Sequence, residues 1–188
     1  MTLAELRSRL PDYAKDLRLN LESVLTDTGA PGLTPQQLAM VAVASAIASR
    51  HAPLTESVVD WARGTLDDRS LDGARAAAAI MAMTNVYYRF THLVAEREYE
   101  TMRTGLRMNV LATHGSDKAG FELASLAVSA INGCGKCIDS HEKTVRGHGV
   151  GAQGVQSAIR IAATIHAVAV ALEQADAAAG ASSAAAAA

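Results

Sequence analysis

Two cysteines and a histidine stand at spacings that bring their side chains together on one helix. Cys134 and Cys137 are three residues apart, and His141 follows four residues after Cys137. On a helix that turns about 100° per residue, all three share the apolar stripe of Ile138 and Val145. A dithiol at a helix N-terminus is suited to redox chemistry, because the helix dipole favours the nucleophilic thiolate. One thiol can attack a disulfide or a peroxide, the other can resolve the intermediate as an internal disulfide, and His141 can take the proton of Cys137.

Three other interpretations of these residues stay open. A structural disulfide between Cys134 and Cys137 would close only a four-residue loop, which contributes roughly 2 kcal/mol. A zinc site would have three ligands on one helical stripe and would need a fourth from elsewhere in the chain. The third interpretation is a pair of inert, buried thiols.

Glu122 is a candidate partner for His141. It lies at the margin of the apolar stripe of the preceding helical segment, 117–131, where a glutamate is ordinarily a solvated surface acid. If that segment packs antiparallel or steeply against the cysteine helix, Glu122 reaches His141, orients the imidazole and raises its basicity.

The elements that must position these residues are predicted to be helices. Capping residues, prolines and glycines divide the chain into helix-length segments, and no segment alternates polar and β-branched residues as a strand does. Thr34, Pro35 and Gln37 form a capping-box pattern that opens a helix toward Arg50. The other segments that matter for the site are 70–93, 117–131, 134–148 and 152–176, with two short ones at 96–105 and 106–112. We expect an all-α fold of about eight helices in a single domain, residues 1–176, followed by a low-complexity Ala/Ser tail, residues 177–188.

Composition narrows the class of protein. The 188 residues include 17 basic and 19 acidic side chains, a net charge of −2, so neither a nucleic acid nor a membrane surface is an expected partner. The first ten residues lack the apolar stretch of a secretory signal, and the apolar runs 38–48 and 161–172 fall short of the about 18 residues of a membrane span. We therefore expect a cytoplasmic protein. No glycine-rich phosphate loop is found, so no bound flavin or nicotinamide is expected, and reducing power must arrive through another protein or a small dithiol. We expect no bound metal either, because three ligands on one helical stripe fit a tetrahedral ion poorly.

Over nearly the whole chain, the sequence resembles the alkyl hydroperoxide reductase D (AhpD) family, within the carboxymuconolactone decarboxylase-like superfamily. The resemblance excludes only the alanine-rich tail. The segments that carry it are 121–123, 127–137, 141–142, 10–16, 79–89 and 105–109.

The resemblance implies an all-helical subunit of a homotrimer that reduces organic hydroperoxides and re-reduces the peroxiredoxin AhpC. Its electrons would come from dihydrolipoamide on a lipoylated dehydrogenase-complex subunit and from dihydrolipoamide dehydrogenase. Carried over by motif, Cys137 forms the sulfenic acid and the mixed disulfide, while Cys134 is the proton donor and resolving thiol. His141 and Glu122 form the proton relay that activates Cys137.

One residue departs from the family pattern. Better-known members carry a histidine between the two cysteines, where this chain has Lys136. The helical wheel directs Lys136 away from the buried stripe, so no role of that histidine transfers to it. Two further functions stay open: a decarboxylase-like activity, which rests on fold analogy alone, and a non-catalytic helical protein with a redox-sensing dithiol or a zinc ion. The pairs Met81/Met83 and Tyr87/Tyr88 are expected in a core or a subunit interface.

Overall fold

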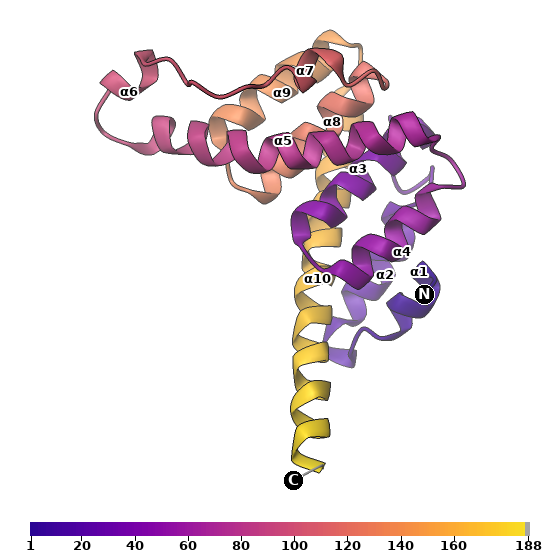
Figure 1. Ribbon diagram of the computed structural model, residues 1–188. Coiled ribbons are helices and arrows are strands. Elements are labelled where there is room, and N and C mark those ends of the chain that lie inside the picture. Colours follow the sequence, from indigo (N-terminus) through magenta and orange to yellow (C-terminus); the bar gives the residue numbers. More distant parts are fainter. Residues whose placement is uncertain (187–188) are drawn as a thin grey trace.

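Helices form every regular element in the described part of the chain. The computed structural model describes the backbone of residues 1–186 and the surroundings of side chains up to Gly180. Within these residues it has ten α-helices, one 3₁₀ turn and no strand, which confirms the all-α prediction (Figure 1). In chain order the elements are α1 (Leu3–Ser8), η1 (Asp12–Ala14), α2 (Lys15–Val24), α3 (Pro35–Ser49), α4 (Ala52–Ala62), α5 (Asp68–Leu93), α6 (Glu98–Thr101), α7 (Val110–Thr113), α8 (Lys118–Ile131), α9 (Gly135–Gly147) and α10 (Ala152–Ala186).

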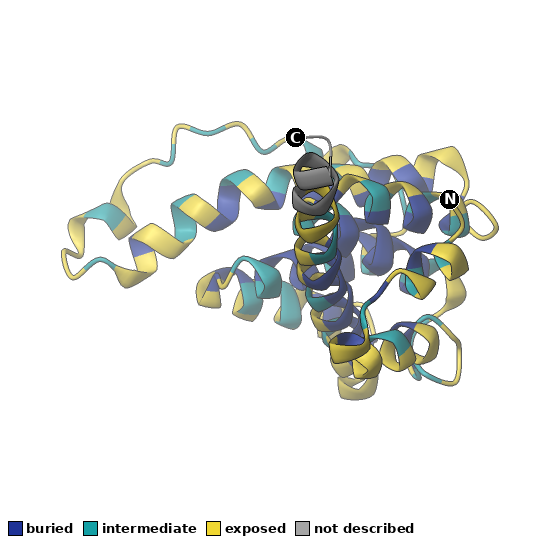
Figure 2. Cartoon of the chain, turned by 90° about the horizontal axis from the view of Figure 1, so that it is seen from below, coloured by how far each residue is buried: buried dark blue, intermediate teal, exposed yellow. Residues whose placement is uncertain are grey.

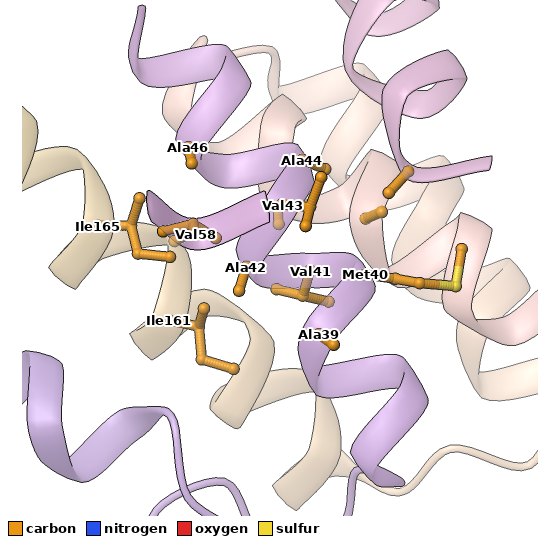
Figure 3. Packing of buried hydrophobic residues seen from close by; sticks show 14 of the residues in the cluster. Ala39, Met40, Val41, Ala42, Val43, Ala44, Ala46, Val58, Ile161 and Ile165 are labelled. Carbon is orange, nitrogen blue, oxygen red and sulfur yellow. The ribbon is translucent and has the colours of Figure 1, made fainter. Parts of the chain in front are cut away.

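The centre of the fold is α3. Every residue from 38 to 46 is buried, and a helix that is buried all round belongs in the core of a protein. Its neighbours are α4, α5, α8 and α10, and Figure 3 shows Ile161 and Ile165 of α10 and Val58 of α4 around it. The helix begins as predicted: Pro35 takes the first position, and Thr34 and Gln37 close a capping box.

The elements around the cysteines lie on one side of this core. Helices α5, α8 and α9 pack against one another. After α5, the chain passes through the single turn of α6 and returns as an irregular segment along α5 to α7 (Figure 1). The far end of α5 and α6 project as an arm, and most of its surface is exposed (Figure 2).

Helix α10 runs past the expected end at residue 176, as far as Ala186. Alanine is the strongest helix former, so the alanine-rich sequence continues the helix although residues 177–180 are exposed. Residues 187–188 of the expected tail lie outside the described residues. By length and composition α10 is apolar enough to cross a membrane, contrary to the estimate from its apolar runs. More than half of its most apolar stretch is buried inside the protein, which accounts for that composition.

Several boundaries differ from the predicted ones. The segment expected to start at Ser70 begins two residues earlier, because Asp67 caps it by accepting the N–H of Ser70. Helix α8 begins at Lys118, one residue later than expected, because Asp117 is its N-cap and accepts the N–H of Gly120. The short segments 96–105 and 106–112 contribute only one helical turn each, α6 and α7.

Candidate active site

The turn between α8 and α9 delivers the first cysteine to a helix N-terminus. The N–H of Gly133 donates to Ala130, and the N–H of Cys134 donates to the carbonyl of Ser129, the pair of bonds that defines a Schellman motif. Gly133 has φ of 68°, a left-handed conformation that a side chain would strain. Cys134 then becomes the N-cap of α9, with its Sγ accepting the N–H of Cys137 at 3.3 Å.

The two cysteines form a disulfide, and they differ in accessibility. Cys134 is fully buried, whereas Cys137 is 6% exposed and lines a cavity beside α9. A molecule that enters this cavity therefore meets the sulfur of Cys137, with that of Cys134 behind it.

Glu122 and His141 meet across the packed helices α8 and α9. Glu122 Oε2 lies 2.7 Å from His141 Nδ1, and both side chains are mostly buried. An ionised carboxylate only accepts hydrogen bonds, so this bond places a proton on Nδ1 and leaves Nε2 as the nitrogen that can accept one. Nε2 lies 3.2 Å from the Sδ of Met81 on α5. Glu122 therefore contacts His141. This is the contact that we expected if the helices of these two residues pack against each other.

The cavity of about 280 Å³ has mostly apolar walls that come from α5, α7, α9 and the segment before α7. Its lining residues are Met81, Thr84, Tyr88, Met108, Leu111, Lys136, Cys137, Ser140 and His141. Lys136 is exposed, as the helical wheel predicted, but its ammonium lies 5.8 Å from the centre of the Tyr88 ring and borders the same cavity as Cys137. Met81 is a core residue, as expected, and also lines the site, whereas Tyr88 is half-buried and lines the site.

A second histidine lies close to this centre. His114 stacks on Phe121 with ring centroids 3.9 Å apart, and its Nδ1 accepts the N–H of Ser116. Burial lowers the pKa of His114 below its ordinary value, although the negative charge of Glu122 partly opposes the shift. Among the described residues, no three histidine, cysteine or acidic side chains converge as a metal site would require.

Sequence reasoning missed the α5 side of the site. Met81, Thr84 and Tyr88 lie within the segment 79–89, whose likeness to the family was the available signal, but nothing in their residue types pointed to a dithiol some 50 residues away in the sequence.

The chain is similar to known proteins over most of its length. The model of the Carboxymuconolactone decarboxylase family matches residues 97–181. The chain is 54% identical over 173 residues to "Alkyl hydroperoxide reductase AhpD" of Gluconacetobacter diazotrophicus, covering 92% of this chain and 93% of that protein. It is 51% identical over 176 residues to the protein of the same name in Brucella suis, covering 94% and 99%. A third relative of that name, from Rhodopseudomonas palustris, is 51% identical over 173 residues, or 92% and 94% of the two chains. With half of its residues identical over nearly its full length, the chain belongs to the AhpD family.

Proposed function

We propose that this protein is a thiol-dependent alkyl hydroperoxide reductase. The observation that carries the proposal is the Cys134–Cys137 disulfide at the N-terminus of α9, beside the Glu122–His141 pair and in the wall of a cavity. The names of the relatives, which describe alkyl hydroperoxide reductases, support the same reaction class.

The reaction begins with the reduced dithiol. His141 takes the proton of Cys137, and the resulting thiolate attacks the terminal oxygen of the hydroperoxide ROOH. The O–O bond breaks, and the alkoxide takes a proton from the site and leaves as ROH. Cys137 is then a sulfenic acid. The Cys134 thiol attacks its sulfur, the S–O bond breaks, and water leaves as the disulfide forms. The buried position of Cys134 directly behind Cys137 suits this resolving role.

A dithiol donor completes the cycle. Dihydrolipoamide attacks the disulfide at Cys137, the accessible sulfur, and a second exchange releases lipoamide and the reduced protein; two electrons and two protons are transferred. The mostly apolar walls of the cavity suit the aliphatic arm of a lipoyl group and the chain of an organic hydroperoxide. Lipoylated dehydrogenase-complex subunits and dihydrolipoamide dehydrogenase are accordingly the proposed electron source. To re-reduce the peroxiredoxin AhpC, the Cys137 thiolate of the reduced protein would attack the AhpC disulfide, and Cys134 would then attack Cys137 in the mixed disulfide, which releases AhpC as a dithiol and restores the Cys134–Cys137 disulfide.

The proposal includes assembly as a homotrimer in the cytoplasm. Large apolar side chains are exposed on the arm formed by the end of α5 and the chain that follows it: Val86, Phe90, Leu93 and Met102. An exposed apolar surface of this kind is typical of an interaction site, and contact between subunits would bury it.

The test couples the purified protein to NADH through dihydrolipoamide dehydrogenase and lipoamide, with an organic hydroperoxide as the acceptor. We expect NADH oxidation that disappears in Cys134→Ser and Cys137→Ser, and faster oxidation of NADH when AhpC is added. Full activity of Cys137→Ser would exclude the proposed reaction.

The description of the matched family model supports a second candidate, a carboxymuconolactone decarboxylase-like activity. Decarboxylation of a lactone needs no dithiol, so cysteine-independent turnover of a lactone acid is the observation that would favour it.

A non-catalytic protein is the remaining alternative. A zinc-binding protein would retain stoichiometric metal after purification, and a redox-sensing protein would cycle its disulfide without catalytic turnover.

A further inference from the structure

A buried polar network connects α5 to the turn that carries Cys134. Asn85 of α5 is 1% exposed, and its side-chain amide makes two hydrogen bonds to this turn. Its Nδ2 donates to Ser129 Oγ at 3.0 Å, and its Oδ1 accepts from Asn132 Nδ2 at 3.0 Å. One amide therefore holds two points of the turn at once.

Both points belong to the Schellman motif. Ser129 supplies the carbonyl that accepts the N–H of Cys134, and Asn132 is the C-cap residue of α8. A second α5 side chain, Arg89, donates from its guanidinium to the Asn132 carbonyl at 2.6 Å. Helix α5 thus binds the turn through the side chains of Ser129 and Asn132 and through the backbone of Asn132.

We propose that Asn85, with Arg89, is a positioning residue of the dithiol: it fixes the turn so that Cys134 stays in place for disulfide formation with Cys137. This inference rests on the proposed function, in which the disulfide opens and closes in every cycle. Asn85 and Arg89 lie in the segment 79–89, which carries part of the family resemblance, so the inference assigns this segment a role in the reaction.

The network matters most when the disulfide is open. In the oxidised protein the covalent bond to Cys137 itself holds Cys134 in place. In the dithiol, only noncovalent contacts hold Cys134 near Cys137, and they determine the effective concentration of one thiol at the other. If the network is removed, the dithiol gains more conformational freedom than the disulfide, because the disulfide bond still holds Cys134. The equilibrium between disulfide and dithiol then shifts toward the dithiol.

Two serines of α8 provide a matched pair for the test. Ser129 and Ser125 are one helical turn apart, and both are fully buried. The Ser129 hydroxyl bonds to Asn85, whereas the Ser125 hydroxyl has no hydrogen-bond partner among the described residues. Replacing either serine with alanine removes the same atom from the same helix, but only Ser129→Ala breaks the network.

The experiment equilibrates the full-length protein with mixtures of dihydrolipoamide and lipoamide and measures its dithiol fraction by thiol alkylation and intact mass. We expect Ser129→Ala and Asn85→Leu to shift the equilibrium constant toward the dithiol by about tenfold, the effect of freeing about one backbone residue in the dithiol but not in the disulfide. Ser125→Ala should keep the wild-type constant. Chemical denaturation of the same variants records any general loss of stability.

Wild-type equilibrium constants in Ser129→Ala and Asn85→Leu would overturn the inference, even if both variants were less stable, because the network would then only fill the core. An equal shift in Ser125→Ala would also overturn it. If Asn85→Leu fails to fold, the comparison of the two serines decides. The measurement contains no peroxide, so a protein that reduces no hydroperoxide refutes the proposed function without changing this result.

Discussion

Replacement of Glu122 by glutamine should slow the peroxide reaction while leaving the fold intact. Glutamine has the shape of glutamate, and its amide oxygen can still accept the Nδ1–H of His141. The variant therefore keeps the 2.7 Å contact and removes only the negative charge. In the proposed reaction, that charge stabilises the imidazolium that forms when His141 takes the proton of Cys137.

The size of the effect follows from the burial of the pair. The His141 and Glu122 side chains are only 13% and 18% exposed, so solvent screens their interaction weakly. A hydrogen bond to a charged group contributes about 1.5–3 kcal/mol and a neutral one about 0.5–1.5 kcal/mol. The difference, about 1–2 kcal/mol, corresponds to a rate loss of roughly 5- to 30-fold.

The assay is the single-turnover rate at which organic hydroperoxide oxidises the reduced protein, with Glu142→Gln as the matched control. Glu142 follows His141 on α9, but its carboxylate is half exposed and faces Arg146 at 3.9 Å. We expect the control to react at the wild-type rate. If Glu122→Gln also reacts within twofold of the wild type, the Glu122–His141 pair takes no part in the proton transfer and the reasoning is wrong.

Three other predictions concern packing, pH and the domain boundary. Gly154→Ala should destabilise the fold by about 1–3 kcal/mol, because the added Cβ would lie 2.5 Å from the Gly32 carbonyl oxygen; calorimetry should show a lower thermal midpoint. Gly180→Ala, where the Cβ would meet no described atom within 4 Å, should keep the wild-type midpoint. Burial lowers the pKa of His114, so the unfolded chain takes up its proton first, and the contribution of His114 to stability is full above about pH 6.5 and declines below it. The thermal midpoint of the wild type should accordingly fall more between about pH 7.5 and pH 5.5 than that of His114→Phe, and equal falls would contradict this assignment. Removal of residues 177–188 should leave the midpoint and the activity unchanged, because Asp176 pairs with Arg9, lies 3.3 Å from His51 and is followed by four exposed residues, 177–180. A large loss of stability would move the domain boundary beyond residue 176.

The features that could be predicted from sequence depend on neighbours in the chain. The capping box of Thr34 and Gln37 and the start of α9 at the cysteines are local patterns, and the structure has both. The common stripe of Cys134, Cys137 and His141 follows from helical spacing alone. These properties need no knowledge of how one helix packs on another.

The remaining parts of the site depend on packing between helices. The 2.7 Å contact of Glu122 with His141 requires α8 and α9 to pack in one particular register. From the sequence, this contact could therefore be predicted only on the condition that the two helices pack in that way. The contact of Met81 with His141 and that of Asn85 with Ser129 join residues 60 and 44 positions apart. The residue types of Met81 and Asn85 suit an ordinary helix core equally well, so only the tertiary structure distinguishes them.

The central claim is that Cys137 is the thiol that reacts with peroxide and that Cys134 resolves the product. The most direct measurement treats reduced Cys134→Ser with one equivalent of an organic hydroperoxide in the presence of dimedone and locates the adduct by peptide mass mapping. We expect the sulfenic acid adduct on Cys137, and much slower labelling of Cys134 in Cys137→Ser, because Cys134 is fully buried behind the sulfur that lines the cavity. Absence of an adduct on Cys137, or equally fast labelling of Cys134, would contradict the account.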